Sequence, residues 1–513
     1  MGGSNVAAWQ SVESPAWLRD AIIYEIFPRV FSKGGTFAEI TARLPELKDL
    51  GVNCIWLMPI HKIGLDGRKG ILGSPYSIYD YYSIDPSYGS PQDFRTLVDS
   101  AHGLGLRVIM DFVANHTSND SVLTRLHPEW FCRDENGRIR RAGFGWDDVS
   151  QLNYHCNPGL EDYMTGVARH WIQDYDVDGF RCDVAALVPV EFWVKFRREI
   201  KGIKPDALLL AESHEPIHNQ LAFDLTYEEW LPGVLEGVAR GTQGADSIRG
   251  LLVQQEREFP PGSLRLRYLE NHDQARAMAR FGREPARAFA LLLFTLDGVP
   301  LLYNGQEVGA TERPSIFDPF TIDWEGTPDA HTTRDLYRSL AHLRAGFPAL
   351  RRGGLSFIDA TGDRVPGAVL AFIRDAQDIP GTRYEAGARD GAAAHGGPGF
   401  ARSDAIVVLN LSGVAQNALI SVNLGTKESR GTGAIPETGA GPGAGSGVAI
   451  PGNRVVEGAP VLREVFRVGG VAGACGGHPV KYGPHGLTVY LDPWSGVVFE
   501  VIKPCRGGPG VVE

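Results

Sequence analysis

The chain lacks the features of a disulfide scaffold, a zinc protein or a nucleic-acid binder. Its 6 cysteines among 513 residues form no CxxC pair, so neither a zinc site nor a disulfide framework is expected. The net charge of -11, with no basic stripe, argues against nucleic acid or an anionic membrane as partner. No apolar run has transmembrane length, and residues 1–10 show no secretory pattern. We therefore expect a cytoplasmic protein, or an extracytoplasmic one if a signal has been removed.

Short apolar runs that alternate with helical patterns are typical of a (β/α)₈ barrel. The length of 513 residues also allows an accessory domain beside such a barrel. Helical spacing of apolar residues predicts helices over 37–50, 91–104, 160–175 and 191–200. Eight strands are predicted at 21–28, 54–59, 107–113, 179–184, 207–212, 221–226, 264–269 and 299–303. Cys54 and Cys182 fall in these strands, where a small buried thiol is expected.

Two regions depart from the barrel pattern. The connection from His116 to Asn157 is about forty residues long, well beyond an ordinary loop. After residue 350, short alternating runs such as 405–411, 487–491 and 496–501 predict an antiparallel β-sandwich. Residues 387–399 and 425–452 are rich in Gly, Ala and Pro, and we expect them to form surface loops because they cannot bury a core.

Four short segments place carboxylates just after predicted strands. They are Asp111-Phe-Val-Ala-Asn-His116, Gly179-Phe-Arg-Cys-Asp183, Leu210-Ala-Glu212 and Glu270-Asn-His-Asp273. A single carboxylate at such a position is usually a helix cap or a salt-bridge partner. In a closed parallel barrel, however, all four strand ends meet at one mouth, where catalysis takes place. With these four segments the chain resembles the α-amylase family (glycoside hydrolase family 13) of retaining α-glucan hydrolases and transglycosylases.

The resemblance extends over roughly residues 15–350. Tyr76 to Tyr81 match the family's Tyr-x-x-x-Asp-Tyr pattern, and 51–59 and 298–305 match its scaffold signatures. The resemblance also implies a short domain inserted after the third strand. The expected division is a barrel over 1–115 and 158–350, an inserted domain over 116–157 and a sandwich domain over 351–513.

Retaining cleavage of an acetal requires two carboxyl groups about 5–5.5 Å apart, one as nucleophile and one as acid and base. The resemblance implies that Asp183 is the nucleophile and Glu212 the acid/base. Arg181 lies two residues before Asp183 and so on the same strand face, where a guanidinium would hold the nucleophile ionised. Glu212 follows an apolar run that could raise its pKa. The alternative is a structural Arg–Asp pair beside a capping glutamate.

The resemblance assigns sugar-binding roles to further residues at the mouth. Asp273 would hold and help to distort the sugar at the cleavage point, and His272 and His116 would bind hydroxyls of the same ring. Tyr76 would stack its ring on the sugar, although a plain core tyrosine is the alternative. Asp111 would support Arg181 from behind.

Several positions depart from the family pattern. Ala186-Leu187 replace a Lys-His pair that binds sugar on the leaving-group side in many relatives; His214 or Glu215 could compensate. Gln151 replaces an acidic residue, which weakens any inference about bond specificity. Asn115 corresponds to a calcium ligand of many relatives, and Asp147 or Asp148 could assist it. Calcium is therefore left open, and the metal site is unknown.

We expect a glycosidase that cleaves α-1,4 bonds in maltooligosaccharides or starch-type α-glucans, with no redox cofactor or nucleotide because no Gly-rich phosphate loop opens a helix. A transglycosylase on the same substrates is the close alternative. A non-catalytic glycan-binding barrel is the rival from another class. Substrate chain length and oligomeric state are left open by the sequence.

Overall fold

The computed structural model describes residues 9–325, 329–375, 404–421, 461–469, 481–483 and 486–502. The two glycine-rich segments, 387–399 and 425–452, lie outside these ranges, as do Cys475 and Cys505. The four cysteines within them are free, and Cys54 and Cys182 are buried in barrel strands as expected.

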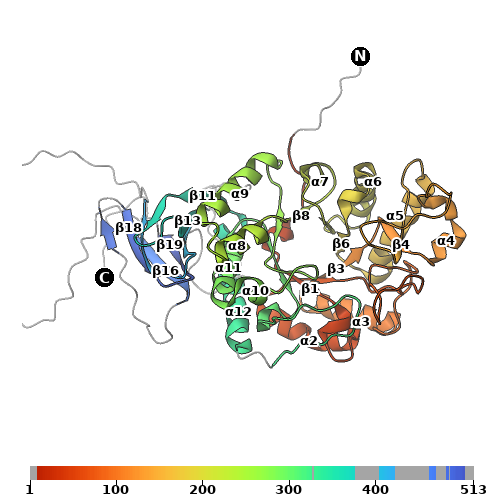
Figure 1. The fold of residues 1–513 in the computed structure, drawn as a ribbon, viewed down its shortest axis with the longest axis horizontal. Helices are drawn as coiled ribbons and strands as arrows, with labels where there is room; N and C mark the ends of the chain where they lie inside the picture. Colours follow the sequence, from red (N-terminus) through yellow and green to blue (C-terminus); the bar gives the residue numbers. More distant parts are fainter. Residues whose placement is uncertain are drawn as a thin grey trace, which may run out of the picture.

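Eight parallel strands close into a barrel, which confirms the predicted fold class (Figure 1). They are β1 (Ile23–Ile26), β2 (Cys54–Leu57), β3 (Arg107–Phe112), β6 (Gly179–Cys182), β7 (Leu208–Ala211), β8 (Leu225–Tyr227), β9 (Arg265–Arg267) and β10 (Val299–Tyr303). The sixth predicted strand, 221–226, begins too early. Leu221 instead ends helix α7 (Pro216–Leu221), and β8 begins only at Leu225.

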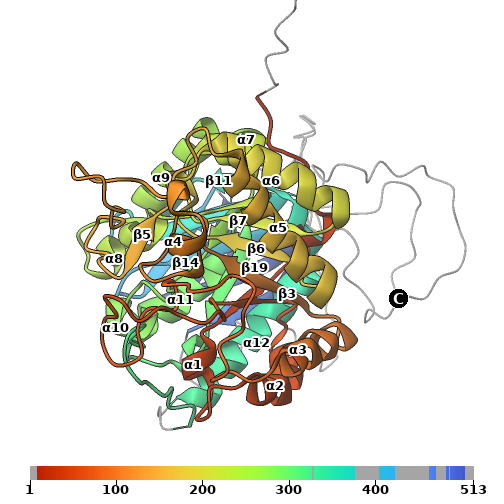
Figure 2. The ribbon, with the colours of Figure 1, turned by 90° about the vertical axis from the view of Figure 1, so that its right-hand side faces the viewer.

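Helices surround the barrel, as Figure 2 shows from the end that carries β4 and α4. The main ones are α2 (Phe37–Leu50), α3 (Pro91–Gly103), α5 (Pro158–Tyr175), α6 (Val190–Ile203), α8 (Leu231–Ala239), α9 (Ala245–Glu258), α11 (Arg283–Thr295) and α12 (Ala330–Gly346). The four helices predicted from the sequence are among them. Helix α2 shows why the prediction works: Thr36 and Glu39 form a capping box at its start, and Gly51 ends it at φ 97°.

Side-chain alternation along the strands fills the barrel with apolar groups and turns polar near the mouth. Ile23 and Ile109 belong to the apolar barrel interior. Because strand side chains alternate, Glu25 and Asp111 lie on the same inward face two residues later. Both carboxylates are almost fully buried. The barrel thus places buried carboxyl groups near the carboxyl ends of its strands.

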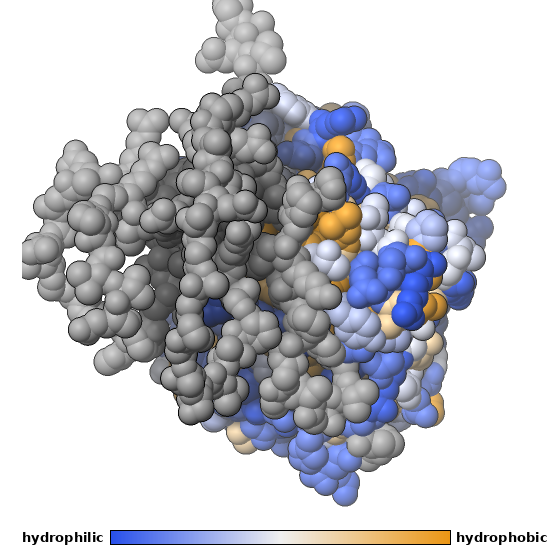
Figure 3. Space-filling view, turned by 90° about the vertical axis from the view of Figure 1, so that its left-hand side faces the viewer, coloured by the Kyte–Doolittle hydropathy of each residue, from blue (hydrophilic) through white to orange (hydrophobic). Residues whose placement is uncertain are grey.

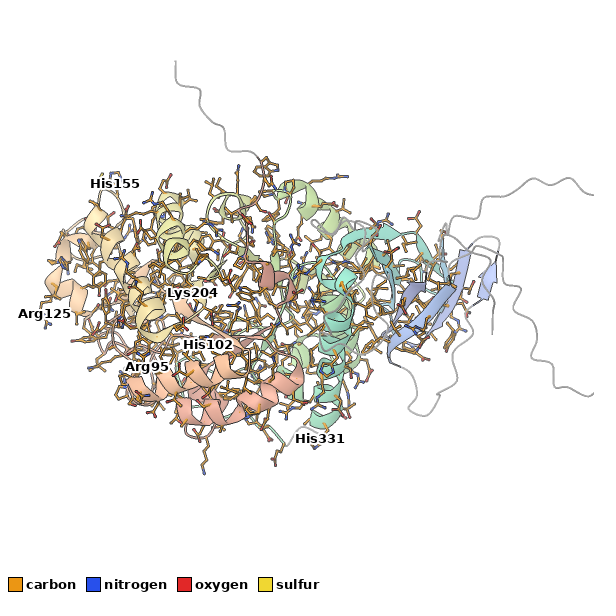
Figure 4. The ribbon with its side chains drawn as sticks, turned by 180° about the vertical axis from the view of Figure 1, so that it is seen from behind. Arg95, His102, Arg125, His155, Lys204 and His331 are labelled. Carbon is orange, nitrogen blue, oxygen red and sulfur yellow. The ribbon has the colours of Figure 1, made fainter. Side chains whose placement is uncertain are left out.

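At the amino-terminal ends of the strands, a buried carboxylate connects two surrounding helices to the barrel. Asp178, just before β6, accepts a hydrogen bond from Val108 N at 2.8 Å and contacts His102 Nε2 at 2.8 Å. Lys204 Nζ lies 2.9 Å from the same carboxylate. Figure 4 shows His102 and Lys204 near each other on the outside of the barrel. These contacts tie α3 and the end of α6 to the barrel floor.

A short segment follows β3 and lies over the barrel mouth. Its strands β4 (His116–Ser118) and β5 (Val149–Gln151) pair antiparallel, with His116 opposite Gln151. Helix α4 (Val122–Leu126) lies between them in sequence and projects at the right of Figure 1.

Two antiparallel sheets follow the barrel, at the left of Figure 1, and the first of them packs against α11. One contains β11 (Gly354–Ile358), β13 (Val369–Asp375), β14 (Asp404–Asn410), β19 (Ser495–Ile502) and β16 (Val461–Val468). The other contains β12 (Ala360–Gly362), β15 (Gln416–Ile420), β18 (Gly486–Leu491) and β17 (Lys481–Gly483). Residues such as Ile406, Val408, Ala418 and Val489 form the apolar layer between the sheets. The described surface visible from this end is mostly hydrophilic (Figure 3). Of the described helices, none is both long and apolar enough to cross a bilayer.

Candidate active site

A cavity of about 150 Å³ opens at the carboxyl ends of the barrel strands. Its lining includes six of the seven residues predicted for the site, and the seventh, Arg181, lies buried against them. The lining residues are Lys69, Ser74, Tyr76, His116, Trp146, Asp148, Val149, Asp183, Val184, Glu212, His272, Asp273, Ile316 and Phe317.

Arg181 joins the carboxylates that the sequence analysis singled out. Its Nη1 donates to Asp183 Oδ1 at 2.9 Å and to Asp111 Oδ1 at 2.8 Å. Its Nη2 lies 2.8 Å from Glu212 Oε2. The two nitrogens share one carbon, so Asp183 and Glu212 are held side by side by a single planar group. Asp111 approaches from β3, as expected for a supporting residue.

The carboxyl cluster holds more negative charge than Arg181 can neutralise. Burial raises the pKa of Asp183 well above its ordinary value; Arg181 opposes this, while Glu212 and Asp111 add to it. Burial likewise raises the pKa of Asp111 to about 6 against the effect of Arg181. Arg181 thus lowers the pKa of Asp183, as the sequence analysis expected, but burial and the two neighbouring carboxyl groups act against it. One guanidinium serves three carboxyl groups, and its effect on the pKa of Asp183 and Asp111 is therefore outweighed by burial together with the neighbouring carboxylates.

Glu212 lies in a more polar setting than its sequence neighbours suggest. The residues of β7 before it point into the core, but Glu212 Oε2 accepts a hydrogen bond from Val184 N at 2.7 Å and contacts Arg181. The expected apolar surroundings thus apply to the strand and not to the carboxyl group. Val184 itself has φ 37°, an uncommon conformation for a β-branched residue. This strained turn directs its N–H at Glu212, which no sequence pattern reveals.

Asp273 and Tyr76 meet at His272. His272 Nε2 lies 3.1 Å from Asp273 Oδ2 and 2.8 Å from the Tyr76 hydroxyl. The rings of Tyr76 and His272 stack, with centroids 5.6 Å apart. Burial would raise the pKa of Asp273, but His272, together with Arg181 and Arg313, outweighs burial and lowers it below its ordinary value. Asp273 is therefore an ionised acceptor at the cavity wall.

His116 approaches the opposite side of Asp183. Its Nε2 lies 3.9 Å from Asp183 Oδ2, and its ring contacts that of Trp146 at 5.5 Å. Burial lowers the pKa of His116 to about 4, so the imidazole is neutral at pH 7. A neutral imidazole can offer either a donor or an acceptor to a sugar hydroxyl.

Sequence reasoning missed part of the cavity wall. Lys69, from the loop between β2 and α3, donates to the carbonyl of Gly145 and lies 3.2 Å from Asp148 Oδ1. Phe317 comes from the loop after β10, and Lys69 lies 5.9 Å from the centre of its ring. These residues stand in loops without periodic pattern, so only the folded chain brings them together.

In the structure, the residues considered for calcium contact other protein groups. Asp148 faces the Lys69 ammonium, and Asn115 Nδ2 lies 3.2 Å from His116 Nδ1. In the described part of the chain, no three His, Cys, Asp or Glu side chains are grouped as a metal would require. Lys69 therefore supplies the positive charge beside Asp148.

The other departures from the family pattern leave an apolar rim beside Val184. Ala186 and Leu187 lie in a short 3₁₀ turn, and Leu187 is 43% exposed. His214 contacts Glu229 and stacks edge-on against Trp230 at 4.8 Å. His214 and Glu215 are not among the residues that line the cavity, and neither are Ala186 and Leu187, whose place they were considered to take.

Comparison with known proteins gives a consistent result. The model of the α-amylase catalytic domain matches residues 15–131 and 243–348. The chain is 36% identical to the maltogenic α-amylase AmyB of Thermotoga neapolitana, with TM-score 0.68, over 79% of this chain and 88% of that one. It is 34% identical to an α-amylase of Lactobacillus plantarum, with TM-score 0.67, over 78% and 91% of the two chains.

A further relative differs in length. The α-amylase MalA of Haloarcula japonica is 31% identical over 367 residues, which make up 68% of this chain and 52% of the relative. The chain thus spans about half the length of MalA.

Proposed function

The chain belongs to the α-amylase family, and we propose that it is a retaining glycosidase that cleaves α-1,4 bonds in maltooligosaccharides or starch-type α-glucans. The observation that carries the proposal is the pairing of Asp183 and Glu212 on one guanidinium, in a cavity that Asp273 also lines. Relatives named maltogenic amylase and cyclomaltodextrinase support an α-glucan substrate.

In the proposed first step, Asp183 attacks the anomeric carbon through Oδ2. This oxygen is buried and has no hydrogen-bond partner among the described residues, whereas Oδ1 is held by Arg181. Glu212 uses Oε2 for Val184 N and Arg181, which leaves Oε1 for the leaving oxygen. The bond from carbon to leaving oxygen breaks, the bond to Asp183 forms, and the proton of Glu212 passes to the released sugar.

In the second step, Glu212 takes a proton from water, the water oxygen bonds to the anomeric carbon, and Asp183 leaves as a carboxylate. Two inversions restore the original configuration. The first step, by contrast, requires Glu212 to carry a proton when substrate is bound and Asp183 to be ionised. Positive charge that develops on the sugar favours an ionised Asp183 and so favours that placement.

The remaining predicted residues bind the sugar at the cleavage point. Asp273 accepts from two adjacent hydroxyls, His272 and His116 contact hydroxyls of the same ring, and Tyr76 offers its aromatic face. No step involves a redox cofactor, a nucleotide or calcium. The proposal also includes the division into a barrel over 1–115 and 158–350, an inserted domain over 116–157 and a sandwich domain over 351–513. It further includes a cytoplasmic location.

The test is product analysis on maltotriose with the wild type and Asp183→Asn. We expect mainly hydrolysis, because Ala186 and Leu187 offer no polar side chain to an acceptor sugar, and lost hydrogen bonds weaken acceptor binding by about 1 kcal/mol each. Asp183→Asn should lower the rate by several orders of magnitude, because the attacking charge is removed. Asp224→Asn is the matched control. Asp224 is a buried aspartate outside the cavity lining, and its Oδ1 lies 2.8 Å from Arg197 Nη1.

Three outcomes would contradict the proposal. Elongated products that dominate at millimolar substrate would make the protein a transglycosylase. A folded Asp183→Asn protein within tenfold of wild type would remove Asp183 as nucleophile. A wild type without turnover on maltotriose, longer maltooligosaccharides or starch would favour the non-catalytic glycan-binding barrel.

A further inference from the structure

A buried carboxylate at the end of β1 has no role in the reaction described above. Glu25 is completely shielded from solvent, and its Oε1 lies 2.5 Å from His272 Nδ1. Its Oε2 is buried without a hydrogen-bond partner among the described residues. A polar oxygen left without a partner in the interior destabilises the fold, so its presence calls for a compensating function.

The hydrogen-bond partners of His272 define its protonation. Nδ1 faces the Glu25 carboxylate, which can only accept a hydrogen bond when ionised. Nε2 lies 3.1 Å from Asp273 Oδ2, which also only accepts. The Tyr76 hydroxyl, 2.8 Å from Nε2, can donate its own proton to Asp111 Oδ2 at 3.1 Å. Both ring nitrogens therefore face acceptors, and an imidazolium satisfies them all.

The other groups around His272 do not offset the two carboxylates. The Trp56 ring meets the imidazole edge-on at 5.8 Å and carries no charge. Arg313 Nε donates to the backbone carbonyl of His272 at 3.2 Å. Arg181 lies over the ring of Tyr76 at 5.7 Å and is engaged by the carboxylates of the cluster. Burial acts to lower the pKa of His272, but Asp273 and Glu25 outweigh burial and raise it well above its ordinary value.

We propose that Glu25 is a positioning residue that keeps a proton on both nitrogens of His272, so that His272 holds Asp273 ionised and oriented for sugar hydroxyls. Glu25 touches neither the sugar nor the reacting carboxylates, and it acts through His272. The consequence for sugar binding rests on the proposed function; the protonation of His272 does not. The line from Glu25 through His272 to Asp273 joins β1 to the loop that follows β9, and only β10 lies between these two strands in the barrel.

Glu25→Gln is the sharpest test because it removes the charge but keeps the shape and an oxygen that can accept from Nδ1. We expect the His272 imidazole, followed by ¹⁵N-resolved NMR, to stay protonated through neutral pH in the wild type. In Glu25→Gln it should lose its proton at least one pH unit lower. The value of kcat/KM on maltotriose should fall about ten- to a hundredfold, as for loss of one charge-assisted contact. The NMR signal of the His272 imidazole is assigned by its absence in His272→Gln.

Glu307→Gln is the matched control. Glu307 is equally buried, accepts from the hydroxyl of Tyr24 at 2.6 Å, and does not contact His272. Its replacement should leave the His272 titration unchanged even if it lowers stability.

The outcomes separate this inference from the proposed function. An unchanged His272 titration in Glu25→Gln would overturn the inference whatever the activity. If Glu25→Gln does not fold, a His272 that is already neutral at pH 7 in the wild type would overturn it equally. A lowered titration in a protein without glycosidase activity would support the role of Glu25 and reject the proposed function instead.

Discussion

At the scale of single residues, one arginine and three carboxyl groups at the barrel mouth govern the proposed chemistry. Arg181 serves Asp111, Asp183 and Glu212 together, and burial raises the pKa of Asp183 and Asp111 against its effect. At this scale the sequence predicts the carboxylates well, because each follows an apolar strand. It does not reveal Glu25, whose partner His272 lies 247 positions away along the chain.

Buried His61, away from the cavity, makes stability depend on pH. Burial lowers the pKa of His61 to about 4, while an unfolded chain keeps it near 6.5. Below pH 6.5 His61 becomes protonated in the unfolded chain, whereas in the folded chain it becomes protonated only near pH 4. The free energy of unfolding should therefore fall by about 2 kcal/mol between pH 7 and pH 5 from this residue alone.

Urea unfolding of His61→Gln and His155→Gln at both pH values measures this contribution. His61→Gln should show the smaller loss of stability on acidification, since its titrating group is gone. His155 is exposed, so His155→Gln should retain the wild-type slope. Equal slopes in the two variants would show that His61 does not titrate as described.

At the scale of elements, the pairing of β6 with β7 places Asp183 beside Glu212. Gly179 begins β6 at φ 140°, and a Cβ there would lie 2.0 Å from the carbonyl oxygen of Leu208. Gly179→Ala should therefore lower the free energy of unfolding by more than about 2 kcal/mol, because strain and a backbone clash add. Thermal or urea unfolding measures the change.

Gly202→Ala provides the control within the same barrel. Gly202 lies in α6, and a Cβ there meets no atom within 4 Å. In a helix the substitution should be neutral or stabilise by up to about 1 kcal/mol. If both variants were equally stable, the close approach of β6 to β7 would not be a constraint.

Helices and strands whose ends are marked in their own sequence can be predicted, whereas those whose ends depend on contacts with distant residues cannot. Helix α2 carries its capping box and apolar face in its own sequence. The apolar run 221–226 looks like one strand, yet Phe223 N donates to His218 O at 2.8 Å and closes the end of α7. The strand is thereby confined to Leu225–Tyr227, which pairs with β7 and β9.

At the scale of the whole molecule, the barrel and the sandwich follow from the order of elements, but their contact does not. Arg374 of β13 is buried and donates through Nη1 to Thr295 O at 2.7 Å, at the end of α11. Arg344 of α12 likewise donates to Phe294 O at 2.9 Å. Arg374 thus joins the sandwich to the barrel, whereas Arg344 holds α12 to α11 beside that junction, and no local pattern predicts either contact.

The central claim is that Asp183 and Glu212 act in a double displacement at the mouth of this barrel. The most direct measurement is proton NMR of the sugar first released from maltotriose, recorded before mutarotation equilibrates the anomers. The account predicts that the α anomer appears first and that the β anomer grows in only afterwards. If the β anomer appears first, water attacks the sugar directly and Asp183 is not the nucleophile.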